Sequence, residues 1–194
     1  MPSLTSVYPS AGSNRLIFRF MLVAGALYLA WFFGYEQWLA VDGRLDAVLC
    51  HHIAAASVGL LRTGGFAAAL AGPGLNLVLM SGEPSVIVGA PCNGLVLYAL
   101  FGGFILAFPG SWRRKVWFIP SGMLLIWVLN VLRVAALAVN HHYSHETVAF
   151  NHHFTFTFVV YGVIFGLWMF WVRRLAASTS DRPLSPLLTD AAHS

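Results

Sequence analysis

The sequence of 194 residues is poor in charge and in cysteine. Charged residues make up only 9% of the chain and hydrophobic residues 58%, whereas a soluble domain carries about 25% charged residues. This shortage of charge excludes an ordinary soluble domain and predicts an integral membrane protein. The two cysteines, Cys50 and Cys92, can form one disulfide bond or remain as two thiols.

Other signals are missing as well. The first apolar segment has aromatic residues at 31–33, where a cleaved signal peptide would need small ones, so we expect it to be retained as a membrane span. The histidine-rich segment 141–146 (HHYSHE) lacks the His-Glu-x-x-His pattern of zinc peptidases. Most of the 11 Lys and Arg residues lie beside apolar segments, which indicates membrane topology rather than nucleic-acid binding.

Four apolar segments have the length and composition of membrane spans. They cover approximately residues 22–35, 94–109, 116–139 and 154–172. Residues 44–72 are different, because two histidines, Arg62 and the pair Gly64–Gly65 interrupt the apolar pattern. The pieces on either side are short for a full span, so we expect interfacial or re-entrant helices there.

The segment LNLVLMSGEPSVIVGAPC (residues 75–92) carries two β-branched runs around a Ser-Gly-Glu-Pro turn, and it predicts a β-hairpin that ends at Cys92. A hairpin must lie outside the hydrocarbon or be covered by protein. The predicted fold is therefore an all-α integral membrane protein, a multi-span helical bundle with a small external re-entrant or β-hairpin region before Cys92. The Ser/Pro-rich ends, 1–14 and 175–194, are expected to be disordered, which leaves 15–174 as the transmembrane domain.

The basic clusters predict the orientation of these spans. Arginines near residues 15–19, the cluster 113–115 and the pair 173–174 should all be cytoplasmic, together with both termini. Cys92 then opens a helix that enters from the outside, Arg133 lies near the outer end of the next span, and His152 and His153 open the last one. Three distant parts of the chain thus bring Cys, Arg and His to the same outer (periplasmic) face of a bacterial inner membrane.

This combination of residue types permits thiol chemistry. A histidine can take the proton of a cysteine thiol, and the thiolate can attack an acyl carbon. Arg133 adds a permanent positive charge that can lower the pKa of the thiol or stabilise an oxyanion. An arginine in an apolar span costs a few kcal/mol, so it is a functional candidate.

Each of these residues also has a structural interpretation. Cys92 could be a packing residue or the partner of Cys50 in a disulfide, and Arg133 could extend to the outer headgroups. The histidine doublets could be interfacial polar residues or ligands. Two alternative functions follow: a His-rich haem- or metal-binding membrane protein, and a non-enzymatic membrane assembly partner with a structural disulfide.

Three segments, APCNGLVLYALF, WVLNVLRVAALA and FNHHFTFTFVVYGVIFGLWMFWV, resemble the signature blocks of the exosortase/archaeosortase family of membrane cysteine transpeptidases. The blocks supply Cys92 with Gly94, then Asn130 with Arg133, then His152 or His153. The match covers residues 86–172, the expected catalytic core. Many family members have more spans than the four predicted here, so the chain resembles a compact form.

The resemblance implies a cofactor-independent cysteine peptidase/transpeptidase with Cys92 as nucleophile, a histidine as acid/base and Arg133 as stabiliser of the transition state. Its substrates would be exported proteins with a C-terminal motif, a transmembrane helix and a basic cluster. The new C-terminus would pass to a surface acceptor such as a glycan or lipid. Asn151–His152, with Phe156 in the position of a family glycine, fits the signature best, and His153 remains the alternative.

Overall fold

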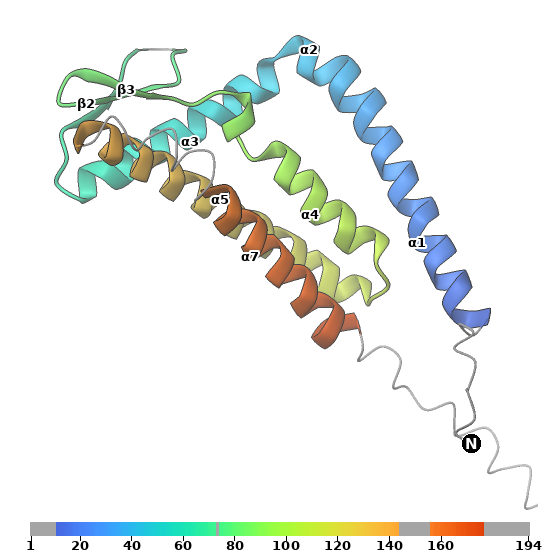
Figure 1. Cartoon of the computed structure of the whole chain (residues 1–194). Helices are drawn as coiled ribbons and strands as arrows, with labels where there is room; N and C mark the ends of the chain where they lie inside the picture. The colour runs from blue at the N-terminus through green and yellow to red at the C-terminus, as the bar shows by residue number, and fades with distance from the viewer. Residues whose placement is uncertain (1–10, 73, 144–155, 177–194) are drawn as a thin grey trace, which may run out of the picture.

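The computed structural model describes residues 11–72, 74–143 and 156–176, and helices dominate it (Figure 1). The helical elements are α1 (Ala11–Ala30), η1 (Trp31–Leu39), α2 (Ala40–Asp42), α3 (Arg44–Thr63), η2 (Ala90–Cys92), α4 (Leu95–Ala107), α5 (Trp112–Tyr143), α7 (Phe156–Phe170) and η5 (Trp171–Ala176). Within these ranges three helices are long and apolar enough to cross a membrane: Ile17–Asp42, Arg44–Thr63 and Trp112–Tyr143. The predicted class, a helical membrane protein, is confirmed.

The first helix runs without a break from α1 through η1 and α2. Gly43, with φ +68°, ends it in the left-handed conformation that glycine adopts most easily. The 26 residues of Ile17–Asp42 correspond to about 39 Å at 1.5 Å per residue, more than the hydrocarbon thickness of a bilayer. None of the apolar window is buried inside the protein, as expected for a helix whose side chains face lipid. The first predicted span is therefore confirmed.

Helix α3 corrects one expectation. Residues 44–63 do not form short pieces but one helix of 20 residues. His51 and His52 are exposed, so they leave the packed face apolar; that face carries Cys50, Ile53, Ala54, Ser57, Val58 and Leu61 at helical spacing. Ser57 Oγ donates a hydrogen bond to the carbonyl oxygen of Val131 in α5 at 3.2 Å. The helix ends at Gly64, where the sequence predicted a break.

The hairpin before Cys92 is confirmed and extended by one strand. Strands β1 (Ala68–Leu70), β2 (Leu77–Met80) and β3 (Glu83–Ile87) form an antiparallel sheet in the order β1-β2-β3. Ser81 and Gly82, both with positive φ, make the turn between β2 and β3. Protein covers one face of the sheet: Val78 and Met80 pack into the core with α3 and α5. The strand β1 is too short for its sequence pattern to predict it.

Helix α4 is shorter than the predicted span of residues 94–109. It has 13 residues, or about 20 Å, which is less than the hydrocarbon thickness. Its C-terminal end is held by a buried lysine: Lys115 Nζ donates hydrogen bonds to the carbonyl oxygens of Leu106 and Phe108 at 2.9 and 2.7 Å. These bonds satisfy carbonyls that the end of a helix leaves without intrahelical partners.

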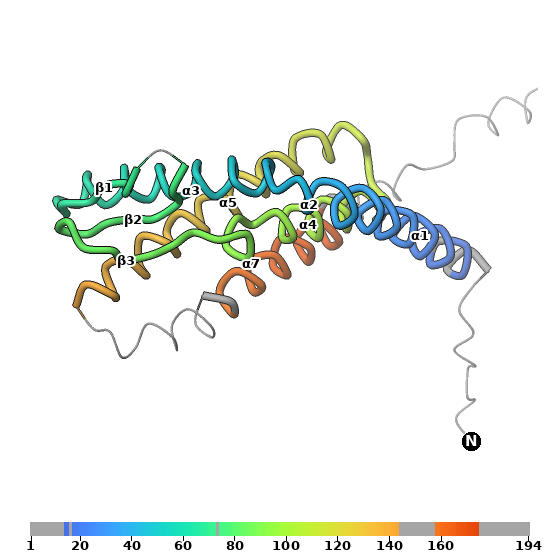
Figure 2. Tube along the Cα trace, turned by 90° about the horizontal axis from the view of Figure 1, so that it is seen from above, coloured from blue at the N-terminus to red at the C-terminus, as the bar shows by residue number. Residues whose placement is uncertain are grey.

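Helix α5, of 32 residues, connects two cores and contains the third predicted span. Its first half packs with α4, α7 and η5 through Ile126, while its second half packs with α3 and the sheet through Val131, Val134 and Ala138. Figure 2 shows the sheet and α3 at one end of the molecule and α1 at the other. The fourth predicted span corresponds to α7 and η5, although its first residues lie outside the described ranges.

Candidate active site

Cys92 lies in a tight turn directly before α4. The 3₁₀ turn Ala90–Cys92 contains Pro91, and Gly94 at φ +77° leads into the helix. Cys92 is half-buried and packs against the core formed by α3, the sheet and the second half of α5. The turn therefore fixes the thiol at the start of α4, where the helix dipole favours a negative charge.

The next residue, Asn93, is almost completely buried, with 1% of its surface exposed. Its Oδ1 accepts a hydrogen bond from the backbone N–H of Leu95 at 2.9 Å, which satisfies one of the first donors of α4. Its Nδ2 donates to Oδ1 of Asp46 in the first turn of α3. Asp46 also accepts a hydrogen bond from the Tyr35 hydroxyl, which lies 3.0 Å from both carboxylate oxygens.

Two of the predicted sequence blocks meet at Gly94. The glycine is buried beside the amide of Asn130, which is itself 1% exposed on α5. A Cβ atom at Gly94 would collide with Asn130 Nδ2 and would lie 3.3 Å from Cζ of Tyr98. Arg133 follows on the next turn of α5, half-buried and with its Nε inaccessible to solvent. The structure thus brings the Cys-x-Gly block onto the Asn-x-x-Arg block.

Basic residues are concentrated at one end of the bundle, while Arg44, Arg62 and Arg133 lie on α3 and the second half of α5. The start of α1, the start of α5 and the end of η5 lie at one end, with the basic residues Arg19, Arg113, Arg114, Arg173 and Arg174 (Figure 1). The contacts agree, because Phe20 meets Phe108 at a ring distance of 6.2 Å and Phe118 meets Trp171 at 5.1 Å. Cys92 lies at the opposite end of α4. Along α5, Arg133 is about 27 Å from Lys115, close to the thickness of the hydrocarbon.

The comparison with protein families agrees with this arrangement. The sequence profile of transmembrane exosortases matches residues 1–174. The chain belongs to the transmembrane exosortase family. No curated protein and no solved structure matches it.

Not every residue of the exosortase signature can be placed. His152 and His153 lie outside the described residues. Helix α7 begins at Phe156 and runs parallel to α4: Phe104 stacks on Trp168 at 4.6 Å, and a Cβ at Gly110 would lie 2.6 Å from Trp171 Cζ2. The first described turn of α7 is therefore at the end of the bundle where α4 starts. Cys92, Arg133 and the histidines remain predictions as catalytic residues.

Cys50 lies in the same core as Cys92, one helical turn after Asp46. It is buried, with 3% of its surface exposed. No disulfide joins the two cysteines in the described part of the chain. Across the described ranges, no three His, Cys, Asp or Glu side chains gather as metal ligands.

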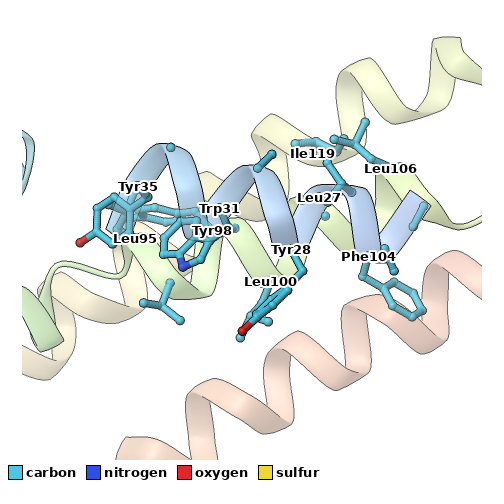
Figure 3. A pocket seen from close by; sticks show the side chains of 18 of the residues that line it. Leu27, Tyr28, Trp31, Tyr35, Leu95, Tyr98, Leu100, Phe104, Leu106 and Ile119 are labelled. Carbon is cyan, nitrogen blue, oxygen red and sulfur yellow. The ribbon is translucent and has the colours of Figure 1, made fainter. Parts of the chain in front are cut away.

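An apolar groove of about 870 Å³ runs between the first helix and α4. Figure 3 shows Tyr35 and Leu95 at one end of this groove and Phe104 and Leu106 at the other. The end at Tyr35 is the end that adjoins Asp46 and Asn93. Sequence reasoning missed both of these residues; the signal was a carboxylate inside the apolar segment 44–72, in a chain with only 7 Asp and Glu.

Proposed function

We propose that this exosortase-family protein is a membrane-embedded cysteine peptidase/transpeptidase. It cleaves the C-terminal sorting signals of exported proteins and transfers the new C-terminus to a glycan or lipid acceptor at the cell surface. The observation that supports this proposal is the contact between Gly94 and Asn130. It joins the turn that carries the thiol, the proposed nucleophile, to the helix that carries Arg133, the proposed stabiliser of the oxyanion.

In the proposed reaction the Cys92 thiol gives its proton to His152 or His153, and the sulfur attacks the carbonyl carbon of the scissile peptide. Arg133 stabilises the oxyanion of the tetrahedral intermediate. The C–N bond then breaks, the histidine returns the proton to the leaving amine, and a thioester remains on Cys92. An acceptor nucleophile attacks the thioester and gives its proton to the histidine; the C–S bond then breaks, and the histidine passes this proton to the sulfur, which regenerates the thiol.

The proposed orientation follows from the separation of charge. If the basic end of the bundle is cytoplasmic, as the positive-inside rule requires, Cys92 faces the outer side of the membrane. The contact of Asp46 with both Tyr35 and Asn93 supports this orientation, because it holds the Cys92 turn beside the far end of the first span. The active site would then meet substrates after their export.

The test is co-expression with a protein that ends in a motif, a transmembrane helix and a basic cluster. Cys92→Ala and Cys92→Ser should abolish processing, detected as loss of the size shift of the substrate. Cys50→Ala is the matched control, because it removes the other thiol of the same core, and processing should continue. Normal processing by Cys92→Ala would refute the proposal.

Two further variants test the roles of the remaining residues. Arg133→Lys keeps the charge but loses the planar guanidinium, so processing should fall at least about tenfold. Full activity of this variant would exclude the proposed catalytic role of Arg133 and would favour a side chain that only extends to the lipid headgroups. His152→Ala and His153→Ala should differ, since the proposed reaction needs one histidine as acid and base. We expect the greater loss from His152→Ala.

A further inference from the structure

The carboxylate of Asp46 is bound by neutral partners. It accepts hydrogen bonds from the Tyr35 hydroxyl and the Asn93 amide. The neighbouring acid of the same segment, Asp42, instead pairs with Arg44, where both side chains are exposed. A half-buried carboxylate held by neutral donors must keep them in place to remain stable. Asp46 therefore constrains the orientation of Asn93 more strongly than a neutral acceptor would.

Asn93 connects Asp46 to the candidate nucleophile. The side chain of Asn93 is tied at both ends, to the N–H of Leu95 in α4 and to Asp46 in α3. Its backbone is bonded directly to Cys92, and its N–H donates to the carbonyl oxygen of Ala90 at 3.2 Å. With Asn93 fixed in this way, the backbone of the turn at Cys92 has little freedom to rotate, and this backbone sets the position of the thiol. The start of α3, a favourable place for a carboxylate, becomes the anchor of the Cys92 turn.

Tyr35 adds the third element. It lies in η1, and its hydroxyl links the first span to the same carboxylate. Its ring lines the end of the apolar groove beside Leu95 (Figure 3). Three elements, η1, α3 and the turn before α4, therefore meet at one carboxylate.

From this arrangement we infer that Asp46, together with Tyr35, is a positioning residue for Cys92 and acts through Asn93. This role rests on the proposed function, since it has a catalytic purpose only if Cys92 is the nucleophile. Asp46 itself takes no part in bond making or breaking. It keeps the sulfur in the geometry required for attack, where a displacement of about 1 Å can reduce the rate about a hundredfold.

The first experiment measures processing of the co-expressed substrate. Asp46→Asn should reduce the rate tenfold to a hundredfold (about the loss expected for a misplaced catalytic group), with kcat reduced and KM little changed. Asp42→Asn is the matched control: this acid is four residues away and exposed, and its loss should leave processing unchanged. Tyr35→Phe removes only the hydroxyl and should give a smaller loss in the same direction. Equal activity of Asp46→Asn and the parent protein would overturn the inference.

The second experiment needs no substrate and therefore separates the two hypotheses. In a Cys50→Ala background, the Cys92 thiol of Asp46→Asn should be alkylated at least about fivefold faster, since release of the turn exposes the half-buried thiol to the reagent more often. In a Cys92→Ala background, the buried Cys50 should stay as slow as before, which shows that α3 remains packed. Unchanged alkylation of Cys92 overturns the inference even if the enzyme hypothesis holds. The opposite combination is also informative. If Asp46→Asn changes the alkylation of Cys92 but the Cys92→Ala variant still processes substrate, the proposed function alone is refuted.

A double variant checks that the coupling passes through Asn93. In an Asn93→Ala background, Asp46→Asn should cause less than about a twofold further loss, because the link is already broken. Independent, multiplicative losses would show that Asp46 acts by another route and would overturn the inference. This comparison stays informative if one single variant accumulates poorly, since rates are expressed per amount of folded protein.

Discussion

Replacing Gly94 by alanine tests the contact on which the candidate site depends. Gly94 has φ +77°, and the space that its Cβ would need is occupied by the amide of Asn130. The substitution therefore has two separable effects: strain of the left-handed backbone and collision with α5. Gly43 provides the matched control, because it has nearly the same conformation, φ +68°, but no atom within 4 Å of its Cβ position.

The expected magnitudes follow from these two effects. Left-handed backbone costs an alanine about 1–2 kcal/mol, so Gly43→Ala should reduce the free energy of unfolding by that amount. Gly94→Ala adds overpacking against a buried side chain, which costs a further 1–3 kcal/mol or so. We therefore expect a total loss of about 2–5 kcal/mol for Gly94→Ala. The rate of processing, measured per amount of folded protein, should also fall, since the collision pushes the Cys92 turn away from Arg133.

The assay is reversible unfolding in mixed detergent micelles, followed by the fluorescence of the 7 tryptophans. Adding Asn130→Ala to Gly94→Ala removes the colliding amide, and it should restore about 1–3 kcal/mol relative to the sum of the two single losses. If Gly94→Ala and Gly43→Ala lose the same free energy, the close approach of the two sequence blocks does not exist in the protein. The absence of any coupling between positions 94 and 130 would lead to the same conclusion.

Two other contacts give predictions of the same kind. Lys115→Met keeps the buried aliphatic chain but leaves two carbonyl groups at the end of α4 without their donor. It should reduce the free energy of unfolding by about 2–4 kcal/mol. The control is Arg113→Gln, at an exposed position two residues away, which should leave the free energy of unfolding unchanged. Gly122→Ala collides with the ring of Phe101 and should cost about 1–3 kcal/mol. Gly162→Ala, which meets no atom, should be neutral or slightly stabilising in the same unfolding assay.

The parts of the fold that sequence could predict are those with local causes. The turn at Ser81–Gly82 and the stop at Gly64 depend on backbone conformations that a few residues determine. Local causes also explain the length of α4, which we overestimated: Phe108 is extended, with ψ 143°, because it precedes a proline. The error at α3 has another origin. His51 and His52 lower the mean hydropathy of the segment, yet on the exposed face they do not interrupt a helix.

The candidate site also has a part that the sequence could predict and a part that it could not. The charge rule predicted that Cys92 and Arg133 lie at the same end of the bundle, because the distribution of basic residues is a property of the sequence. The role of Asp46 could not be predicted, since its partner Asn93 is 47 residues away and no periodic pattern relates the two positions. A carboxylate in an apolar segment indicates that a partner exists, but only the packing of α3 against the Cys92 turn identifies it.

The position of the site between the two cores explains why its residues come from such distant parts of the chain. Asn130 lies on α5 between Ile126, which packs with α4 and α7, and Val131, which packs with α3 and the sheet. The Cys92 turn is the link that crosses from the second core to the first, and both its neighbours are fixed, Asn93 by α3 and Gly94 by α5. A single continuous helix thus sets the distance from the turn to Arg133. The thiol and the guanidinium can keep their relative geometry as long as Asp46 retains its hydrogen bonds to Asn93 and to Tyr35 of the first span.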